Sequence, residues 1–510
     1  MGSLDPGAIK QREFSPSLGV AILVLAMCLE RLTNSTADPD LWGYLAFGRL
    51  YWNSGQFPFQ DVFAYLPTLP RWVYHEWLSG VLFYPLFQAA GPVGLQLLKY
   101  GFGLATLGLV YLTARRRGAD SMASLIFLLV IQGFLTSGYS PVRAQVFTFA
   151  FFALSLYLVE TARLTGRWWR LLWLVPLQIF WANLHGGFLA GLGLVGLYAL
   201  GEALSRRPFL PFVLIFLASG LATLINPYGG EYWHYLLRAV SMPRPYITEW
   251  ASVFQNLRTG VSPGQTIYFF LVVFFSLYLA WRTRWRELTP ILALGLTVYL
   301  GMMHQRHQIF FFLLGGAYLP ARLSGFLEKM KSDSHVIAVC RYLGWKTPMA
   351  VGVLLVVLST FKIVHHSPLT LYLPSLPEQI TQSKIYYPVG AVEHIRKNHL
   401  SGNLLTEFDW GEYLIWTLYP QCRVSLDGRY ETVYEEKVCD AYFNFIKGKA
   451  GWRNFLQQYP PELVLVKSQT RIYSLMHAEP GWREAYHDSG SALFLRQDKL
   501  VTPNSLKPSG

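Results

Sequence analysis

The sequence predicts a mostly α-helical, polytopic membrane protein with a small soluble α/β domain at its C-terminal end. Apolar residues make up 52% of the 510 residues and charged residues only 14%, against about 25% in an average soluble domain. About eleven apolar stretches are long enough to cross a bilayer, whose core needs roughly 20 residues of helix. After residue 367 short strand-like and helical patterns alternate instead. These observations exclude a disordered chain, a coiled coil and an ordinary soluble enzyme.

The transmembrane domain is expected over residues 17–367, after a short N-terminal segment, 1–16. The expected spans are 17–33, 93–113, 119–138, 146–163, 171–186, 188–204, 209–225, 266–281, 288–303, 308–322 and 349–365. The loops between them alternate in composition. One set is short and basic, as at 115–117 and 163–170, and the other is longer and rich in Trp, Pro, His and carboxylates. Because basic loops stay in the cytoplasm, we assign the first set and the N-terminus to the cytoplasm and the second set to the outside.

Residues 77–90 are apolar but are not expected to cross the membrane. The stretch is about 14 residues long, which suits a helix lying at the interface better than a span. A crossing here would also place every later arginine cluster outside. We therefore include it in a first outward loop, 34–92, as a juxtamembrane helix. This leaves eleven crossings, with the N-terminus inside and the C-terminal domain outside.

The C-terminal region divides into three parts. Residues 368–384 contain several prolines and are expected to form a linker. Residues 385–497 predict the α/β domain, and the polar tail 498–510 is expected to be disordered. Expected strands are 403–407, 422–426, 462–467 and a hairpin over 482–496. Expected helices are 388–399, 433–447 and 451–458.

The net charge of +13 is explained by basic residues in the loops that we assign to the cytoplasm. In a soluble protein such an excess would suggest nucleic acid, but here the basic residues lie in short clusters between apolar spans. No nucleic-acid partner is therefore expected. Of the four cysteines, Cys422 and Cys439 fall in the C-terminal domain. They could form a disulfide if that domain is outside the cytoplasm, and both states stay open.

Five of the candidate functional residues lie in the first outward loop. Apolar residues recur at helical spacing over 40–53, which predicts an amphipathic helix on the membrane surface. Asp40 would lie at its N-cap, where a carboxylate accepts backbone N–H bonds. That structural role is the alternative to a catalytic one. The loop also contains Asp38, Asp61, His75 and Glu76.

The stretch Asp-Leu-Trp-Gly-Tyr at 40–44 resembles the catalytic loop of the GT-C superfamily. These are integral-membrane glycosyltransferases that use polyprenyl-phosphate-linked sugars. Protein O-mannosyltransferases and aminoarabinose transferases of lipid A carry Asp-Glu-x-x-Tyr here, with the Asp taken as general base. This chain keeps the Asp-to-Tyr spacing but has Leu41 in place of the acid. Asp40 is thus the implied base, with Asp38 and Asp61 as alternatives.

The chain also resembles an uncharacterised bacterial branch of GT-C-like proteins. The shared pattern is D-x-W … G-x-x-P-x-x-D … W-x-x-H-E-W-L, matched here by Asp40, Pro58, Asp61, Trp72 and residues 75–78. The resemblance implies a GT-C fold and a multi-pass protein of the bacterial inner membrane. It also implies a polyprenyl-phosphate-sugar donor. The acceptor, whether glycan, lipid or protein, stays open, as do the sugar and the oligomeric state.

Displacing a sugar from a lipid phosphate needs a base for the acceptor hydroxyl and positive charge on the departing phosphate. We expect the phosphate to meet Arg143, Arg306 and His307. The residues expected to line the substrate cavity are His75, Glu76, His185 and Glu249. A hard divalent metal, Mg or Mn, is an alternative source of positive charge, with Asp61, His75 and Glu76 as its ligands.

Two other functions remain open. A transporter or flippase of lipid-linked sugars should show inverted repeats or charges at the membrane midplane, whereas the polar residues here fall at the expected outer edge. A non-catalytic envelope-glycan assembly protein could be built on the same fold. In the C-terminal domain, Asp409, Glu412, Asp427 and Arg429 could contact an acceptor glycan, and Asp427-Gly428 could equally be a plain turn.

Overall fold

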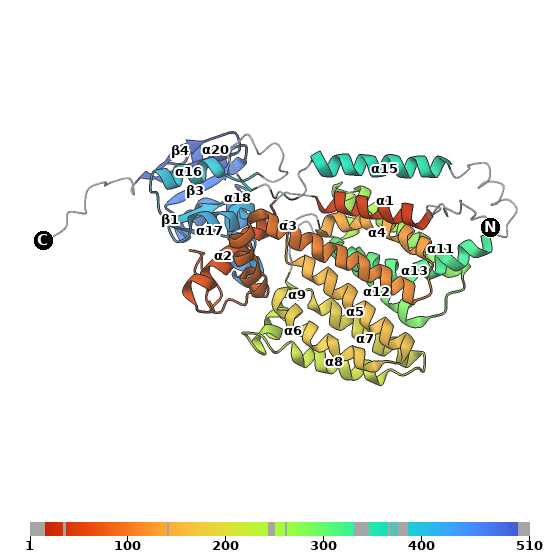
Figure 1. Ribbon diagram of the computed structural model, residues 1–510. Coiled ribbons are helices and arrows are strands. Elements are labelled where there is room, and N and C mark those ends of the chain that lie inside the picture. Colours follow the sequence, from red (N-terminus) through yellow and green to blue (C-terminus); the bar gives the residue numbers. More distant parts are fainter. Residues whose placement is uncertain are drawn as a thin grey trace, which may run out of the picture.

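A computed structural model describes the chain over most of its length. The described residues are 16–33, 37–139, 142–242, 250–260, 263–330, 346–365, 369, 371, 373–374 and 386–497. The expected linker lies almost wholly outside them, and the polar tail and Glu249 lie wholly outside them. Long helices run side by side, and the sheet-containing C-terminal domain covers the end of the bundle where α2 lies (Figure 1).

The helices of the membrane domain follow the expected spans closely. They are α1 (Pro16–Leu32), α2 (Pro39–Ser54), α3 (Trp77–Arg116), α4 (Ser121–Tyr139), α5 (Gln145–Thr165), the 3-10 helix η1 (Trp168–Trp173), α6 (Leu174–Leu184), α7 (Phe188–Leu204), α8 (Leu210–Ala222), α9 (Glu231–Ser241), α10 (Val253–Thr259), α11 (Pro263–Arg282), α12 (Leu288–Met303), η3 (Gln305–His307), α13 (Gln308–Met330) and α15 (Lys346–His365). The segment between α8 and α11 thus contains two further short helices, α9 and α10.

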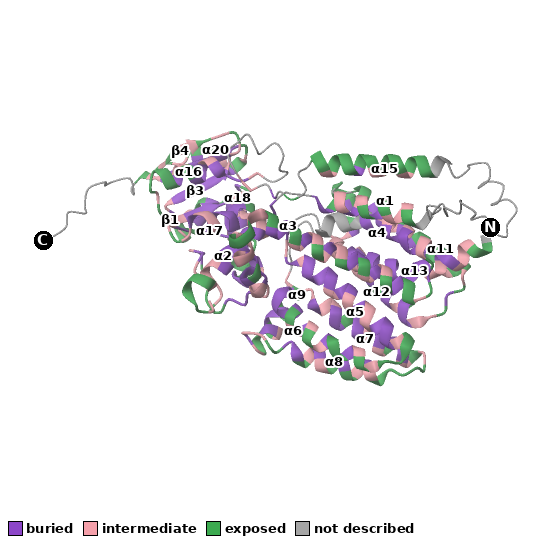
Figure 2. Cartoon of the chain, in the orientation of Figure 1, coloured by how far each residue is buried: buried purple, intermediate pink, exposed green. Residues whose placement is uncertain are grey.

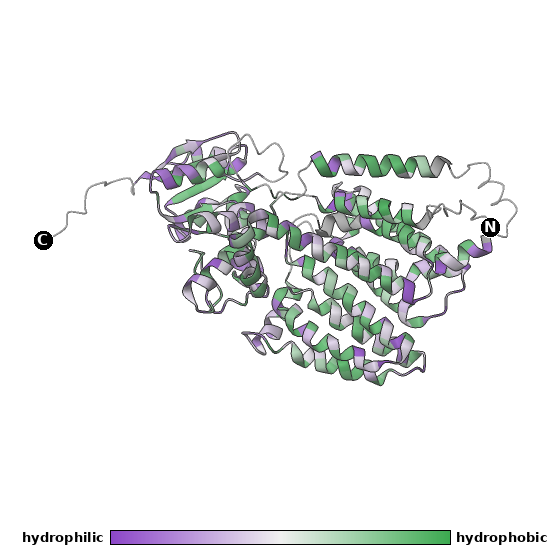
Figure 3. Cartoon of the chain, in the orientation of Figure 1, coloured by the Kyte–Doolittle hydropathy of each residue, from purple (hydrophilic) through white to green (hydrophobic). Residues whose placement is uncertain are grey.

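Four helical segments among the described residues are long and apolar enough to cross a membrane: Trp77–Arg116, Gln145–Thr165, Pro263–Arg282 and Gln305–Lys329. Five other apolar helices are shorter. The expected eleven crossings are therefore not confirmed. Apolar side chains nevertheless cover much of the outer surface of the bundle, most plainly on α15, which is both exposed and hydrophobic (Figures 2 and 3). The helical domain is that of a membrane protein.

Helix α3 is broken where the sequence predicts two separate helices. Gly91 has φ 57° and ψ −152°, a conformation outside the helical region that favours glycine. Pro92 follows it, and proline starts a helix more easily than it continues one. The segment before Gly91 corresponds to the short helix expected at 77–90, and the segment after it corresponds to the span expected at 93–113.

Helix α2 differs from the expectation in its surroundings. All eight residues from Leu41 to Gly48 are buried, so the helix is not amphipathic. It packs against α3 on one side and against α17 of the C-terminal domain on another. The sequence pattern could not reveal this, because the second covering surface comes from residues almost 400 positions away.

The C-terminal domain is a five-stranded sheet flanked by helices. Its elements are α16 (Val389–Lys397), β1 (Gly402–Thr406), η5 (Phe408–Trp410), α17 (Gly411–Leu418), β2 (Cys422–Val424), η6 (Tyr430–Thr432), α18 (Glu436–Ile446), α19 (Arg453–Gln458), β3 (Leu463–Lys467), α20 (Arg471–His477), β4 (Trp482–His487) and β5 (Ser491–Arg496). The strand order is β2-β1-β3-β5-β4, with β1 parallel to β2 and β3, and β5 antiparallel to β3 and β4. The strands agree with the prediction, but α17 and α20 were not expected. Cys422 and Cys439 are buried free thiols.

The loop between α2 and α3 is joined to this domain at the edge of its sheet. Ala64 pairs in parallel with Val424 of β2, through hydrogen bonds of 3.0 Å from Tyr65 N to Val424 O and 2.9 Å from Val424 N to Phe63 O. Pairing covers the exposed backbone of β2. The loop thus serves as an additional edge strand.

A buried charge cluster strengthens this joint. The guanidinium of Arg429 forms ion pairs with Asp427, at 2.7 Å, and with Asp61 from the loop between α2 and α3. It also lies over the rings of Phe63 and Trp72. Asp61 in turn accepts hydrogen bonds from the backbone N–H groups of Phe63 (3.1 Å) and Ala64 (2.7 Å).

A second buried network ties the ends of α3, α5, α7 and α12 together at the opposite end of the bundle. Its arginines include two from the clusters that the sequence assigned to the cytoplasm. Arg117 pairs with Glu160 at 2.6 Å and with Glu287 at 3.0 Å, and Arg163 pairs with Glu202 at 2.8 Å. These arginines therefore have a packing role in addition to any role in topology.

We predict that Asp61→Ala weakens the joint between the two domains. The substitution leaves a buried Arg429 with one carboxylate fewer, which typically costs about 3–5 kcal/mol. Thermal unfolding of the purified protein in detergent measures the effect. Asp409→Ala is the matched control, since Asp409 pairs with Lys467 at the surface and should cost less than about 1 kcal/mol. Equal unfolding temperatures for the two variants would contradict the assignment.

Candidate functional site

The candidate site begins at the N-terminus of α2. Asp38, not Asp40, is the N-cap: its side chain accepts a hydrogen bond of 3.1 Å from the backbone N–H of Asp40. The N-cap assignment of Asp40 was therefore wrong by two residues. Proline is favoured at the first helical position, and Pro39 occupies it, which moves the cap to the residue before it. Asp40 lies in the first turn, and its side chain is 30% exposed.

Arg143, just before α5, connects both aspartates. Its Nε lies 3.2 Å from Asp38 Oδ1, and its terminal nitrogen pairs with Asp40 Oδ2. The two ion pairs hold both carboxyl groups in place. Asp40 therefore combines a fixed orientation with access from solvent, as a general base requires.

Glu76 and two histidines form a second group close to Asp40. Glu76 caps the start of α3, and its Oε2 accepts a hydrogen bond of 3.0 Å from the Tyr44 hydroxyl. Its Oε1 lies 3.3 Å from His185 Nε2 and 3.7 Å from His75 Nε2. His75 stacks on Tyr235 and reaches its hydroxyl at 3.1 Å. The structure thus brings together three of the four predicted cavity residues.

The surroundings of His185 determine which nitrogen carries its proton. Nδ1 accepts from the backbone N–H of Gly187 at 2.9 Å and lies 2.7 Å from the Thr148 hydroxyl. Thr148 itself accepts from Trp181 Nε1 at 2.8 Å. A neutral ring that accepts at Nδ1 must carry its proton on Nε2. His185 therefore donates toward Glu76.

Burial makes both members of this pair uncharged near neutral pH. It raises the pKa of Glu76 to about 8, and the negative charge of Asp40 adds to the shift. Burial, together with the charges of His75, Arg306 and Arg143, holds the pKa of His185 well below its usual value. The group formed by Glu76, His75 and His185 therefore presents hydrogen-bond donors and little negative charge close to Asp40.

Arg306 lies in η3 between α12 and α13. Its guanidinium stacks 4.7 Å from the ring centre of Trp250, and no carboxylate of the described residues pairs with it. Its charge acts on both Glu76 and His185, which places it near them. His307 contacts the same tryptophan ring. Among the predicted phosphate ligands, Arg306 therefore has an unneutralised charge, whereas Arg143 is already paired with two aspartates.

The C-terminal domain contributes a carboxyl group of its own to the site. Glu412, in the first turn of α17, is 5% exposed, and its Oε2 accepts a hydrogen bond of 3.1 Å from Gly43 N in α2. The sequence singled out Glu412 only as a possible acceptor contact. Nothing in the sequence indicates that it meets α2, because the contact joins residues 369 positions apart.

The predicted metal ligands do not come together. Asp61 is buried against Arg429, away from the pair that His75 forms with Glu76. Among the described residues, no group of three or more His, Cys, Asp or Glu side chains could hold a metal ion. The expectation of a site made by Asp61, His75 and Glu76 is corrected on this point, because Arg429 already neutralises Asp61.

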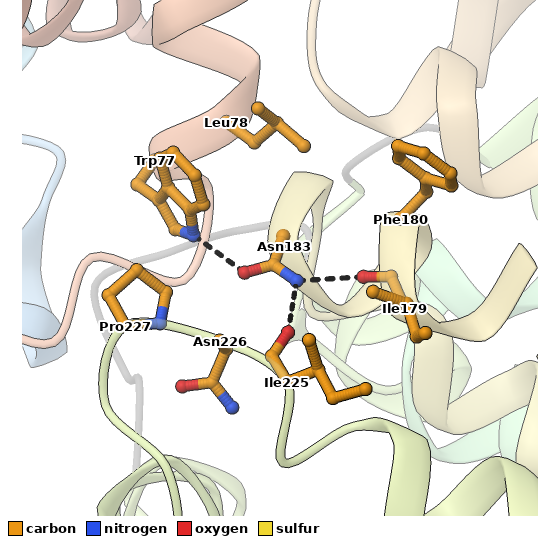
Figure 4. A pocket seen from close by; sticks show the side chains of 8 residues that line it. All are labelled: Trp77, Leu78, Ile179, Phe180, Asn183, Ile225, Asn226 and Pro227. Carbon is orange, nitrogen blue, oxygen red and sulfur yellow. Dashed lines mark hydrogen bonds between the residues drawn. The ribbon is translucent and has the colours of Figure 1, made fainter. Parts of the chain in front are cut away.

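An apolar groove of about 380 Å³ opens beside the site (Figure 4). Its wall includes Trp77, next to Glu76, and Asn183, two residues before His185. Trp77 Nε1 donates to Asn183 Oδ1 at 2.8 Å. Phe180 and Ile225, also in the lining, are largely exposed. The groove therefore runs from the apolar outer surface of the bundle to the residues beside the candidate site.

Comparisons with known proteins find similar structures but no similar sequences. Neither the protein-family models nor the curated proteins match the chain. The oligosaccharyltransferase of Archaeoglobus fulgidus in its apo form matches with a TM-score of 0.55 and 12% identity, over 96% of this chain and 76% of that one. ArnT from Cupriavidus metallidurans bound to undecaprenyl phosphate matches with a TM-score of 0.53 and 13% identity, over 96% and 99%.

The chain has the GT-C fold. A second structure of the archaeal enzyme AglB, in complex with an inhibitory peptide and a dolichol-phosphate, agrees, with a TM-score of 0.54 and 11% identity over 95% of this chain and 75% of that one. At such identities the likeness shows the fold alone. It confirms the fold implied by the first-loop motif, while the role of each site residue stays a prediction.

The raised pKa of Glu76 predicts a pH dependence of stability. A carboxyl group whose pKa is higher in the folded state than in the unfolded state contributes its full stability at a pH below its ordinary pKa of 4.5. This contribution to the free energy of unfolding is lost as the pH rises toward about 8. The unfolding temperature of the wild type should therefore fall across this range, and Glu76→Gln should flatten that fall. Glu393→Gln, at an exposed position, is the control. Parallel curves for all three proteins would refute the assignment.

Proposed function

We propose that this protein is a membrane glycosyltransferase that moves a sugar from a polyprenyl-phosphate-linked donor to an acceptor at the outer face of a membrane. The observation that carries the proposal is the partly exposed Asp40, oriented by Arg143 at the end of a GT-C bundle. Two structures of this fold are described with a lipid phosphate, dolichol-phosphate in one and undecaprenyl phosphate in the other. We further propose that the membrane is the bacterial inner membrane, with the C-terminal domain in the periplasm.

The proposed reaction is an inverting displacement. The acceptor hydroxyl attacks the anomeric carbon while Asp40 removes its proton. The bond between that carbon and the phosphate oxygen breaks on the opposite face, and the phosphate leaves with the electron pair. Asp40 Oδ2 is held by Arg143, so Oδ1 is the oxygen that we assign to the proton.

The leaving phosphate carries the charge that the site has to stabilise. We assign Arg306 as the ligand of this phosphate, because its guanidinium has no carboxylate partner among the described residues. We assign His307, which contacts the same tryptophan ring, as its neighbour in the phosphate site. Glu76, whose pKa is raised to about 8, adds little negative charge beside the phosphate near neutral pH, and His185 holds it in place through Nε2. The reaction as proposed uses no metal ion.

The central prediction concerns Asp40→Asn in cells that lack the chromosomal gene. Loss of the base should slow transfer by about 100- to 10,000-fold, so a lipid-linked sugar accumulates and its glycan product disappears. Mass spectrometry of polyprenyl-phosphate sugars and envelope glycans measures both. Asp440→Asn, at an exposed position of α18 and at matched expression, should behave as wild type. If Asp40→Asn matches wild type while the deletion alone changes the profile, a transporter or a non-catalytic assembly role replaces the enzyme.

The phosphate assignment predicts a loss of donor affinity in Arg306→Ala. A charge-assisted hydrogen bond contributes about 1.5–3 kcal/mol, so polyprenyl phosphate should bind about tenfold more weakly or worse. Arg282→Ala is the matched control, because Arg282 also stacks on a tryptophan ring but lies at the far end of α11. Calorimetry with undecaprenyl phosphate in detergent gives the two affinities. Equal affinities would exclude Arg306 as the ligand.

A further inference from the structure

Glu412 lies in a slot that two glycines make for its carboxyl group. A Cβ atom on Gly43 of α2 would lie 2.3 Å from Glu412 Oε2. A Cβ atom on Gly428, which follows β2, would lie 2.8 Å from Glu412 Oε1. Side chains at either position would exclude the carboxyl group. The membrane domain and the C-terminal domain therefore each leave room for the same buried acid.

Asp40 approaches the same glycine. Its Oδ1 would lie 3.3 Å from a Cβ atom on Gly428, close to the place that Glu412 Oε1 approaches. The other oxygens have separate partners: Asp40 Oδ2 has Arg143, and Glu412 Oε2 has the backbone N–H of Gly43. The two free carboxyl oxygens therefore face the same small space over Gly428.

The charges around Glu412 oppose a second negative charge in this space. Asp40, Asp427 and Glu76 are the acidic groups that face it, and Arg429 is the basic one. Arg429 is already neutralised by Asp61 and Asp427. Burial, followed by the charges of Asp40 and Asp427, raises the pKa of Glu412 well above its usual value. Two carboxyl groups that face the same buried space tend to share one proton.

We propose that Glu412 is the second carboxyl of the transfer site, supplied by the C-terminal domain, and that it shares a single proton with Asp40 across Gly428. With the proton on Glu412, its Oε1–H points into the space that Asp40 Oδ1 also faces. Glu412 is thus a positioning residue that acts through Asp40. This role in the reaction rests on the proposed function, whereas the shared proton does not.

The consequence is that the site is complete only when the C-terminal domain is docked. Arg143 fixes Asp40 from the side of the bundle, and Glu412 faces it from α17. A carboxylate at position 412 would repel Asp40 and the donor phosphate, whereas an uncharged hydrogen-bond donor would not. An amide should therefore replace Glu412 better than either a shorter acid or no polar group.

Infrared spectroscopy tests the shared proton without any need for activity. A protonated carboxyl group has its own carbonyl stretching band, so the difference spectrum between wild type and Glu412→Gln at neutral pH should show one such band. The band should titrate at lower pH in Asp40→Asn, because the negative neighbour is gone. Glu393→Gln should give no band. Absence of the band, or an unchanged titration in Asp40→Asn, overturns the pairing.

Transfer kinetics test the role in the reaction. Glu412→Ala and Glu412→Asp should lower kcat by about 100-fold with little change in the KM of the donor, while Glu412→Gln restores most of the rate. Equal losses in all three variants would reduce Glu412 to a packing residue. If the infrared coupling is found but Asp40→Asn transfers normally, the pairing stands and the proposed function fails. Thermal unfolding of each variant confirms that it is folded.

Discussion

The buried ion pair between Arg429 and Asp61 is the interaction on which the site depends. It joins the loop between α2 and α3 to the C-terminal domain, and Asp427 completes the charge balance. The pairing of Ala64 with Val424 adds main-chain hydrogen bonds at the same joint. A buried ion pair contributes little net stability to a protein. Removing one partner nevertheless destabilises the protein strongly, because the other charge stays buried without compensation. Here the pair fixes the position of one domain on the other, and with it the contact of α17 with α2.

Two effects limit the negative charge of the resulting site. Some charges are neutralised by ion pairs, and some carboxyl groups are kept uncharged by burial. Asp40 is paired with Arg143, and Arg429 is neutralised by two aspartates. Glu76 and Glu412 are instead kept uncharged by burial and by the charge of Asp40. Three charged acids near one reaction centre, Asp40, Glu76 and Glu412, would otherwise repel a lipid phosphate. The arrangement leaves Asp40 as the proposed base and the guanidinium of Arg306, with which no carboxylate of the described residues pairs.

The sequence predicted the helices of the membrane domain and the strands of the C-terminal sheet, because apolar length and strand periodicity are local signals. It also predicted that Asp40, Arg143, Glu76 and His185 belong to one site, because each lies at an end of an apolar stretch on the expected outer side of the membrane. It failed wherever two distant segments meet. The burial of α2, the capture of Asp61 by Arg429 and the approach of Glu412 to Gly43 all depend on the docking of residues 386–497, for which no local pattern exists. The N-cap error at Asp40 has a local cause, since Pro39 at the first helical position already identifies Asp38 as the cap.

The most direct test of the account is an electron cryomicroscopy structure of the wild-type protein with undecaprenyl phosphate. The account predicts phosphate density beside the guanidinium of Arg306, on the side of the site that faces Asp40, with the lipid chain running toward the apolar surface. The C-terminal domain should be docked, with Glu412 against Gly43. Phosphate bound instead at the opposite end of the bundle, among Arg117 and Arg163, would contradict the placement of the site.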